Sequence, residues 1–304
     1  ETPLSPLAFI RCLQETGIPD GVVNAVTGSG SEIGPLLINN PLVKKVAFTG
    51  STAVGREILA ACAPFLKKVS LELGGSLPMI ICGDCDLTAA VAGATRRSFR
   101  NMGQICIAVN RIYVDRKIYA EFLNKFQRSA EKLQVGDGLE GSPDLGPMCT
   151  RQGMETTQRH IDDALAKGAR LLCGGGRPEG LPGNKGYYYA PSILADVNHE
   201  MLVMQEETFG PLVGVMPFDT VDDAIELAND SPYGLAAIVY TNSITLTNRL
   251  TLEINAGNVA VNNPDAGVLN APYGGWKDSG FGHEHGPGGL YEYLHTKHIR
   301  VRYL

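Results

Sequence analysis

The sequence predicts an α/β protein with a partial doubly wound (Rossmann-like) sheet, a second α/β domain and a C-terminal strand. Three observations support this. Helix and strand patterns alternate at short spacing over residues 5–80, the rhythm of a βαβαβ parallel sheet. Alternation continues with longer helices after LELGG (71–75), and the final segment HTKHIRVRYL (295–304) is rich in β-forming residues. The parts we expect are residues 1–74, 75–276 and 277–304.

The first region opens on a helix. Ser5 is a suitable N-cap and Pro6 a suitable first helical residue, which predicts a helix over 6–15. Apolar runs and glycine turns then predict strand 22–26, a helix to residue 38, strand 45–48, helix 53–63 and strand 68–73. This is about half of the strands of a full doubly wound sheet. Because the chain has no initiator Met and starts at a helix, we expect that an N-terminal portion is missing.

The second region contains longer elements. They are helix 86–99, strand 111–114, helix 117–133, helix 152–167, a strand-like segment 169–173 and helix 221–229. Thr220 with Asp223 three residues later forms a capping-box-like pair at the start of the last helix. The C-terminal strand alone would leave an exposed sheet edge, so we expect a partner strand and a homo-oligomer.

Composition excludes several classes of partner. The chain has 304 residues, 44% hydrophobic and 19% charged, as in an ordinary globular protein. A net charge of −6 without a basic tract argues against nucleic acid and anionic membranes as partners. The sequence contains no run of 18 apolar residues, which is the length that a membrane-spanning helix needs. Seven cysteines, an odd number without a disulfide pattern, favour a reducing compartment and a cytoplasmic protein.

Two glycine turns are candidate phosphate-binding loops. Gly28 opens GSGSEIG, whose GxGxxxG spacing is one residue longer than the usual dinucleotide motif, so a plain turn is the competing interpretation. Gly50, Ser51 and Gly55 lie in GSTAVG, between a strand and a helix, where helix amides can hold a pyrophosphate. Capping of the helix by Ser51 or Thr52 explains the second turn equally well.

Cys106 and Glu72 are the candidate reactive pair. Cys106 stands between Ile105 and Ile107, and these apolar neighbours would raise the pKa of its thiol. Glu72 ends an apolar strand, so it is either a surface residue or a buried base with a raised pKa. The glycines Gly74 and Gly75 would leave the backbone soft just beyond it.

For the other candidates, a structural explanation is favoured. Arg96, Arg97 and Arg100 complement a helix dipole, although Arg100 could also bind an anionic substrate group. The pair Cys82 and Cys85 has too few companions for a zinc site, so we predict no metal. The six histidines show no ligand spacing and offer no evident partner for a cysteine.

Six motifs, in order along almost the whole chain, resemble the NAD(P)-dependent aldehyde dehydrogenase superfamily. They are FTGSTAVG (48–55), LELGG (71–75), GQIC (103–106), EETFGPLV (206–213), SPYGLAAIVYT (231–241) and PYGGWKDSGFG (272–282). The resemblance implies a cofactor-binding part over 1–74, a catalytic domain over 75–276 and a return segment with an oligomerisation strand over 277–304. It also implies that NAD or NADP is the cofactor and an aldehyde the substrate.

The resemblance assigns a role to each matching residue. Cys106 matches the nucleophile and Glu72 the general base, which we expect to act through water because a charged carboxylate would disfavour the thiolate. Glu207 matches the carboxylate that holds the nicotinamide ribose, with Phe209 beside the ring. The remaining residues expected at the cofactor are Gly28, Gly50, Ser51, Gly55, Leu73 and Gly74.

Within the superfamily, Phe99-Arg100-Asn101 and Asn110-Arg111 are most similar to succinate-semialdehyde dehydrogenases. That similarity implies that Arg100 binds the substrate carboxylate. Ala108 and Gly267 depart from the pattern, since some members have a second cysteine and a carboxylate-binding serine near these positions.

The resemblance also implies that a second oxyanion donor and a cofactor-binding lysine would lie before residue 1. Two alternatives to a complete dehydrogenase therefore stay open, a catalytically incomplete fragment and a cofactor-independent thiol esterase that needs only Cys106 and Glu72. Either a homodimer or a homotetramer fits.

Overall fold

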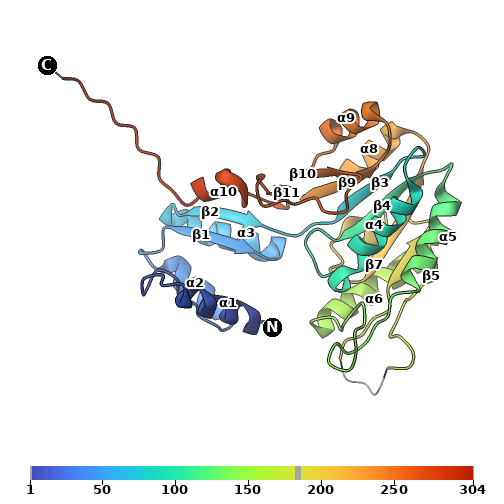
Figure 1. Cartoon of the computed structure of the whole chain (residues 1–304), viewed down its shortest axis with the longest axis horizontal. Helices are drawn as coiled ribbons and strands as arrows, with labels where there is room; N and C mark the ends of the chain where they lie inside the picture. Colours follow the sequence, from blue (N-terminus) through green and yellow to red (C-terminus); the bar gives the residue numbers. More distant parts are fainter. Residues whose placement is uncertain (1, 182–185, 304) are drawn as a thin grey trace. The chain divides into compact units, whose positions relative to one another are not determined.

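The structure is a computed structural model that describes residues 2–181 and 186–303. The chain forms two compact units (Figure 1). The first comprises residues 1–46 and 57–68, and the second comprises residues 47–56 and 69–304.

The first unit contains helices α1 (Leu4–Glu15) and α2 (Gly30–Asn39). The predicted start of α1 is wrong by two residues, because Pro3 is the N-cap and Ser5 lies inside the helix without capping it. Pro3 has φ −78° and ψ −20°, which already suits a helix. Pro6 is tolerated in the first turn because N–H groups there have no helical acceptor.

The predicted strand over residues 22–26 is absent. Val22 and Val26 are 65% and 74% exposed, and no strand in the described part of the chain pairs with this segment. A strand exists only as part of a ladder that satisfies its backbone groups. The apolar pattern is real, but without a neighbouring strand it does not produce β-structure.

The remaining predicted elements of the first region are confirmed. β1 (Lys45–Thr49) leads into α3 (Thr52–Cys62), and β2 (Lys68–Glu72) follows. These two strands form a three-stranded sheet of order β1-β2-β12, in which β12 (Gly280–Phe281) runs antiparallel to β2. Glu72 therefore lies at the end of β2, opposite Gly280.

A seven-stranded sheet of order β10-β9-β3-β4-β7-β6-β5 forms the core of the second unit. Its strands are β3 (Leu77–Ile81), β4 (Val109–Asp115), β5 (Arg170–Cys173), β6 (Ser192–Ala195), β7 (Leu212–Phe218), β9 (Ala236–Tyr240) and β10 (Asn258–Val261). All neighbours pair in parallel except β5 and β6. Because β3 is buried at every position, it has no alternating pattern from which a strand could be predicted.

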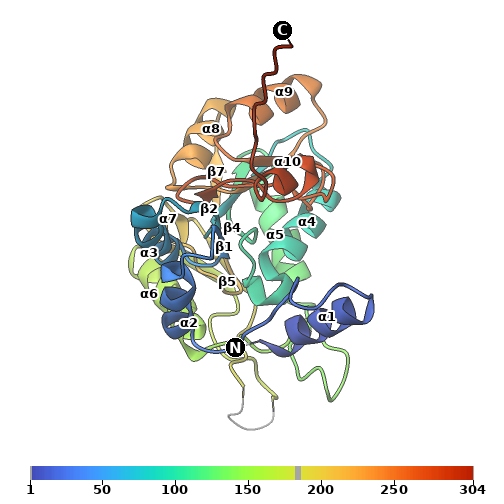
Figure 2. The same cartoon turned by 90° about the vertical axis from the view of Figure 1, so that its left-hand side faces the viewer.

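Helices cover both faces of this sheet, as Figure 2 shows, with α4 and α5 on one side and α6 and α7 on the other. Their bounds are α4 (Leu87–Phe99), α5 (Tyr119–Ala130), α6 (Arg151–Ala166), α7 (Leu202–Gln205), α8 (Val221–Asn229) and α9 (Ile244–Glu253). Asp86 caps α4 by accepting the N–H groups of Thr88 and Ala89. The predicted capping box of Thr220 and Asp223 is confirmed at α8.

The C-terminal segment differs from expectation. After α10 (Gly286–Tyr291) the chain forms no strand up to residue 303, and residue 304 lies outside the described residues (Figure 1). Ile299 and Val301 are 73% and 62% exposed. As at residues 22–26, β-forming residues without a partner strand stay irregular.

None of the helices in residues 2–181 and 186–303 combines the length and apolar character that crossing a bilayer requires.

Candidate active site

The LELGG turn at the end of β2 is the platform of the candidate site. Ser279, which is fully buried, holds this turn from the PYGGWKDSGFG segment. Its carbonyl accepts the Leu73 N–H at 3.1 Å, and its hydroxyl donates to the Gly74 carbonyl at 2.7 Å. Two residues that are 205 positions apart in the sequence, Gly74 and Ser279, thus join the two motifs by a hydrogen bond.

Cys106 reaches this platform through an unusual turn after α4. The turn is a 3-10 segment, Arg100–Gly103, in which Asn101, Met102 and Gly103 have φ of 54°, 60° and 67°. Successive residues in the left-handed backbone conformation reverse the direction of the chain sharply. Non-glycine residues adopt this conformation at a cost in free energy. A side chain at Gly103 would also collide with the carbonyl of Gly210. This position therefore requires glycine for both space and conformation.

The Gly74–Gly75 pair has a different role from the softness we expected. A Cβ atom on Gly75 would collide with the carbonyl oxygen of Cys106, and one on Gly74 would lie 2.5 Å from Oε2 of Glu207. The missing side chains therefore admit the cysteine loop on one side and a carboxylate on the other. The structure brings together Glu72, Gly74, Cys106 and Glu207.

Glu72 is buried, with 6% of its surface exposed. Burial raises the pKa of its carboxyl to about 7, and the nearby charge of Glu284 acts in the same direction. The Cys106 thiol and the Tyr273 hydroxyl, as hydrogen-bond donors toward the carboxylate, partly offset this rise. Its Oε1 atom has no hydrogen-bond partner among the described residues. Glu72 is therefore a buried carboxyl with a raised pKa and not a surface residue.

Burial also raises the pKa of the Cys106 thiol to about 12, and the Glu72 carboxylate adds to the rise. Cys82 and Cys85, at about 12 and 11, have similarly raised pKa values because they too are buried. The pKa therefore does not distinguish Cys106 from structural thiols. Its distinction is geometric, since a buried carboxylate lies beside it. In the described part of the chain, no group of three or more His, Cys, Asp or Glu side chains is arranged to hold a metal ion.

Glu207 approaches the platform from the EETFGPLV segment. Its Oε1 accepts the Gly75 N–H at 3.1 Å. Burial raises the pKa of this carboxyl to about 7, and the Gly75 N–H opposes the rise. Phe209, two residues later, is 45% exposed and has φ 48°. An exposed ring beside a fixed carboxylate suits the edge of a ligand site.

A buried histidine that our sequence analysis missed holds the same segment. His160 on α6 is fully buried, and burial lowers its pKa. Its Nδ1 lies 3.0 Å from the Thr208 hydroxyl and its Nε2 lies 3.2 Å from Oε2 of Glu206. Arg159, which donates to the same Glu206 oxygen at 2.8 Å, lies 3.2 Å from Nε2. Both neighbours of Glu207 are thereby tied to α6, a relation that sequence spacing does not reveal.

The GSTAVG turn begins α3 as expected. The Ser51 hydroxyl accepts the Val54 N–H at 3.4 Å, which is the helix-capping arrangement. Leu73 packs against Gly55, where an added Cβ would lie 2.5 Å from its side chain. Ser51 is exposed, so the cap does not exclude a ligand at the helix start. Gly28 belongs to the first unit and lies just before α2.

The three arginines at the end of α4, of which Arg100 is the C-cap, have different surroundings. Arg96 forms an ion pair with Asp265 at 2.8 Å, and the buried Arg97 lies 3.6 Å from the same carboxylate. Arg100 is exposed, and no carboxylate of the described residues forms an ion pair with it. Arg100 is therefore the arginine of this group that is free to meet an anion.

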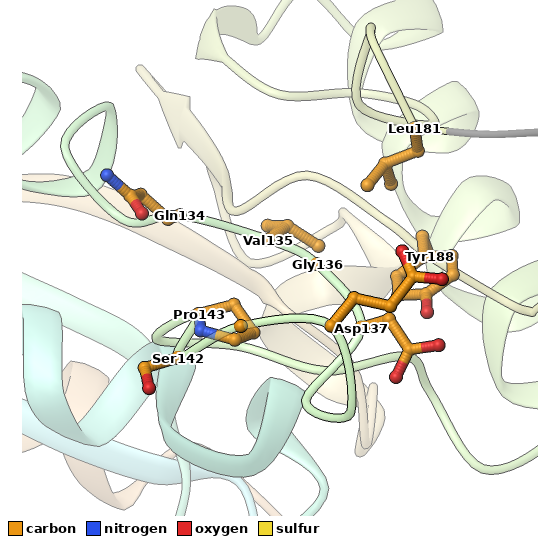
Figure 3. A pocket seen from close by; sticks show the side chains of 10 residues that line it. Gln134, Val135, Gly136, Asp137, Ser142, Pro143, Leu181 and Tyr188 are labelled. Atoms are coloured by element: carbon orange, nitrogen blue, oxygen red, sulfur yellow. The ribbon is translucent and has the colours of Figure 1, made fainter.

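A cavity of about 480 Å³ lies elsewhere in the second unit (Figure 3). The loop over residues 134–143 lines it together with Leu181 and Tyr188. Its charged side chains are Asp137 and Glu140, and it contains no predicted site residue. Volume alone does not identify this cavity as the reaction site.

Comparison with known proteins identifies the family. The model of the aldehyde dehydrogenase family matches residues 1–299. The chain belongs to the aldehyde dehydrogenase family. This confirms the resemblance drawn from the six motifs, and with it the α/β fold.

Individual aldehyde dehydrogenases are similar over nearly the whole chain. The 3-sulfolactaldehyde dehydrogenase of Pseudomonas putida is 42% identical over 299 residues, which are 98% of this chain and 61% of that protein. The NADP(+) succinate-semialdehyde dehydrogenase of Escherichia coli (strain K12) is 42% identical over 304 residues, covering 99% and 62%. Betaine aldehyde dehydrogenase of Staphylococcus aureus, solved with NAD+, matches with a TM-score of 0.93 and 35% identity, covering 98% and 59%. The chain thus spans about three fifths of the length of these relatives.

Proposed function

We propose that this site oxidises an aldehyde to a carboxylate with NAD+ or NADP+. The observation that supports the proposal is the meeting of the Cys106 thiol with the buried Glu72 carboxylate, beside a turn that also contacts Glu207. A thiol and a base of raised pKa in contact form the arrangement that nucleophilic catalysis needs. Relatives whose names denote NADP(+) dependence or an NAD+ complex support the choice of cofactor.

The chemistry follows from the two side chains. Glu72, with a pKa of about 7, is poised to take the thiol proton directly or through water. The Cys106 sulfur then attacks the aldehyde carbon, and the backbone N–H of Cys106 can donate to the developing oxyanion. Bound nicotinamide supplies the hydride acceptor. Loss of hydride from the attacked carbon leaves a thioester on Cys106. Glu72 gives up the thiol proton to solvent and then takes a proton from the water that attacks this thioester. The carbon–sulfur bond breaks, the carboxylate is released, and the Cys106 sulfur regains a proton.

The residues around the platform suit a dinucleotide. The exposed start of α3 offers Ser51 and helix N–H groups to a pyrophosphate, and Glu207 offers a fixed carboxylate to ribose hydroxyls. Gly50, Gly55, Leu73 and Gly74 bring backbone close to these groups, and Phe209 presents a ring. Gly28 stays a weaker prediction.

The direct test supplies the chain with NAD+ or NADP+ and a panel of aldehydes, and follows the absorbance of the reduced cofactor. Reduction that depends on both aldehyde and cofactor supports the proposal. A folded chain that reduces neither cofactor with any aldehyde contradicts it, and ester hydrolysis by that chain would favour the thiol esterase instead.

We also propose a substrate with a distal anionic group. Relatives include enzymes named for succinate semialdehyde and 3-sulfolactaldehyde, and Arg100 is an exposed arginine without an ion-pair partner in the described residues. Arg100→Met should raise the KM for succinate semialdehyde about 10- to 100-fold, because a charge-assisted hydrogen bond is lost. The KM for propanal should stay unchanged.

Arg96→Met provides the matched control, because Arg96 lies four residues earlier, in the last turn of α4, and is engaged with Asp265. Equal losses for propanal and the semialdehyde in the Arg100 variant would contradict the assignment.

The other expectations stay proposals. They are the division at residues 74 and 276, a homodimer or homotetramer, and a reducing, cytoplasmic setting. The last is supported by seven cysteines without a disulfide.

A further inference from the structure

Glu207 lies between two residues that both turn toward α6. The backbone at Glu206 is extended, with φ −102° and ψ 156°. Side chains alternate along extended backbone, so those of residues 206 and 208 point to one side and that of Glu207 to the other. The contacts agree with this alternation, because Glu206 and Thr208 both meet His160 on α6. On the opposite side, Oε1 of Glu207 accepts the Gly75 N–H at 3.1 Å.

His160 makes its two contacts from a fully buried position. Its Nδ1 lies 3.0 Å from the Thr208 hydroxyl, which can donate or accept. Its Nε2 faces an acceptor, Oε2 of Glu206, and a donor, Nη2 of Arg159, each at 3.2 Å. Either tautomer of the ring therefore leaves both nitrogens with a partner. Burial lowers the pKa of the imidazole, so the neutral ring acts through these hydrogen bonds and not as a charge.

We propose that His160 is a positioning residue that holds the Glu207 carboxylate at the Gly75 N–H by fastening the two neighbours of Glu207. It acts through those neighbours, since its hydrogen bonds go to residues 206 and 208. The value of this placement for cofactor binding rests on the proposed function, in which Glu207 holds the ribose hydroxyls of NAD+ or NADP+.

The same helix also contacts the turn that leads to Cys106. Just before α6, the Cys149 N–H donates to Oε1 of Gln104 at 2.8 Å. Within α6, Thr157 packs against Gly210, where an added Cβ atom would collide with the threonine side chain. One helix thus holds both the cysteine turn and the segment that carries the carboxylate. Loosening one of these contacts changes where the carboxylate lies relative to the nucleophile.

The test follows the Gly75 amide by residue-resolved hydrogen exchange, measured by NMR in the chain without cofactor. His160→Leu keeps most of the bulk of the side chain and removes both polar atoms. The Gly75 amide should exchange about tenfold faster in this variant, because release of Glu207 removes its acceptor and a hydrogen bond corresponds to about that factor in an opening equilibrium. A role confined to packing around α6 would leave this amide unchanged, since the hydrogen bonds of His160 go to other residues.

Two variants probe the contacts themselves. Glu207→Leu removes the acceptor and should accelerate exchange of the Gly75 amide at least as much as His160→Leu. His160→Asn keeps a polar group near the position of Nδ1 and should restore most of the parent exchange rate.

Thr208→Val removes one of the two contacts without changing the shape of a buried side chain. It should accelerate exchange in the same direction, and it decides the question should His160→Leu not fold. His199→Leu is the matched control, because this largely buried imidazole is hydrogen-bonded to Tyr113 and Asp230 instead. The control should leave the exchange rate unchanged, and thermal unfolding compares the stability of all variants.

Fluorescence titration with NADH and NADPH adds the link to function, and His160→Leu should raise the dissociation constant about tenfold. An unchanged Gly75 exchange rate in folded His160→Leu overturns the inference. So does an unchanged rate in Glu207→Leu, which would show that this carboxylate does not protect the amide. A parent chain that binds neither dinucleotide would contradict the proposed function, while the exchange of the Gly75 amide still decides the placement of Glu207.

Discussion

Replacing Cys106 by alanine should abolish aldehyde-dependent cofactor reduction, lowering kcat by about 1000-fold or more. Removing a nucleophile from a catalytic group typically costs this much or more, because no other atom can form the covalent intermediate. The fold should survive, because the thiol is only partly buried and alanine occupies less space. The measurement is the rate of aldehyde-dependent cofactor reduction, with thermal unfolding of both chains compared.

Cys173→Ala is the matched control for this variant. Its thiol is also partly buried, and burial raises its pKa to about 11, but its hydrogen bond goes to the Pro191 carbonyl at 3.6 Å. The control should keep the parent rate. A Cys106→Ala chain that kept more than about a tenth of the parent rate would rule out covalent catalysis by this thiol.

Local signals in the sequence predicted the helices of the second unit well. Asp86 at the start of α4 and the Thr220–Asp223 pair at α8 act through hydrogen bonds within three residues of each other. Capping of this kind depends little on the rest of the fold. α3 was predicted for the same reason, because the glycine turn between the preceding strand and this helix is also a local signal.

The errors concern features that depend on distant partners. Residues 22–26 and the C-terminal tail have β-forming residues, yet neither has a pairing strand in the described chain, so both stay irregular. The motifs predicted Cys106 and Glu72 as site residues, but sequence distance hid the contacts of His160 with Glu206 and Thr208. His160 lies 46 residues from Glu206 in the sequence. Only the tertiary structure shows that they meet.

Replacing Glu72 by glutamine should lower the rate of aldehyde oxidation by about 100- to 10,000-fold, the usual contribution of a general base. Glutamine fills the same space but cannot accept a proton from the thiol or from the hydrolytic water. Iodoacetamide should also alkylate Cys106 faster in the same variant, because the charge that opposes the thiolate is gone. A more reactive thiol in a slower enzyme would separate the role of Glu72 as base from any role in activating the sulfur.

The same substitution should make the chain more stable at neutral to alkaline pH. The folded state raises the pKa of Glu72 from 4.5 to about 7, so it favours the protonated carboxyl. That favourable contribution is complete below about pH 4.5 and is lost as the pH rises through about 7. Burying the charged form then costs about 3 kcal/mol, which glutamine avoids because it is neutral at every pH.

Urea unfolding of parent and Glu72→Gln chains at pH 4 and pH 8 measures this difference. The two chains should have equal stability at pH 4, and the variant should be more stable by about 2–3 kcal/mol at pH 8. A difference that did not change with pH would show that Glu72 titrates alike in the folded and unfolded chains. The predicted pattern, greater stability with lost activity, is expected where a buried charge is retained for chemistry rather than for folding.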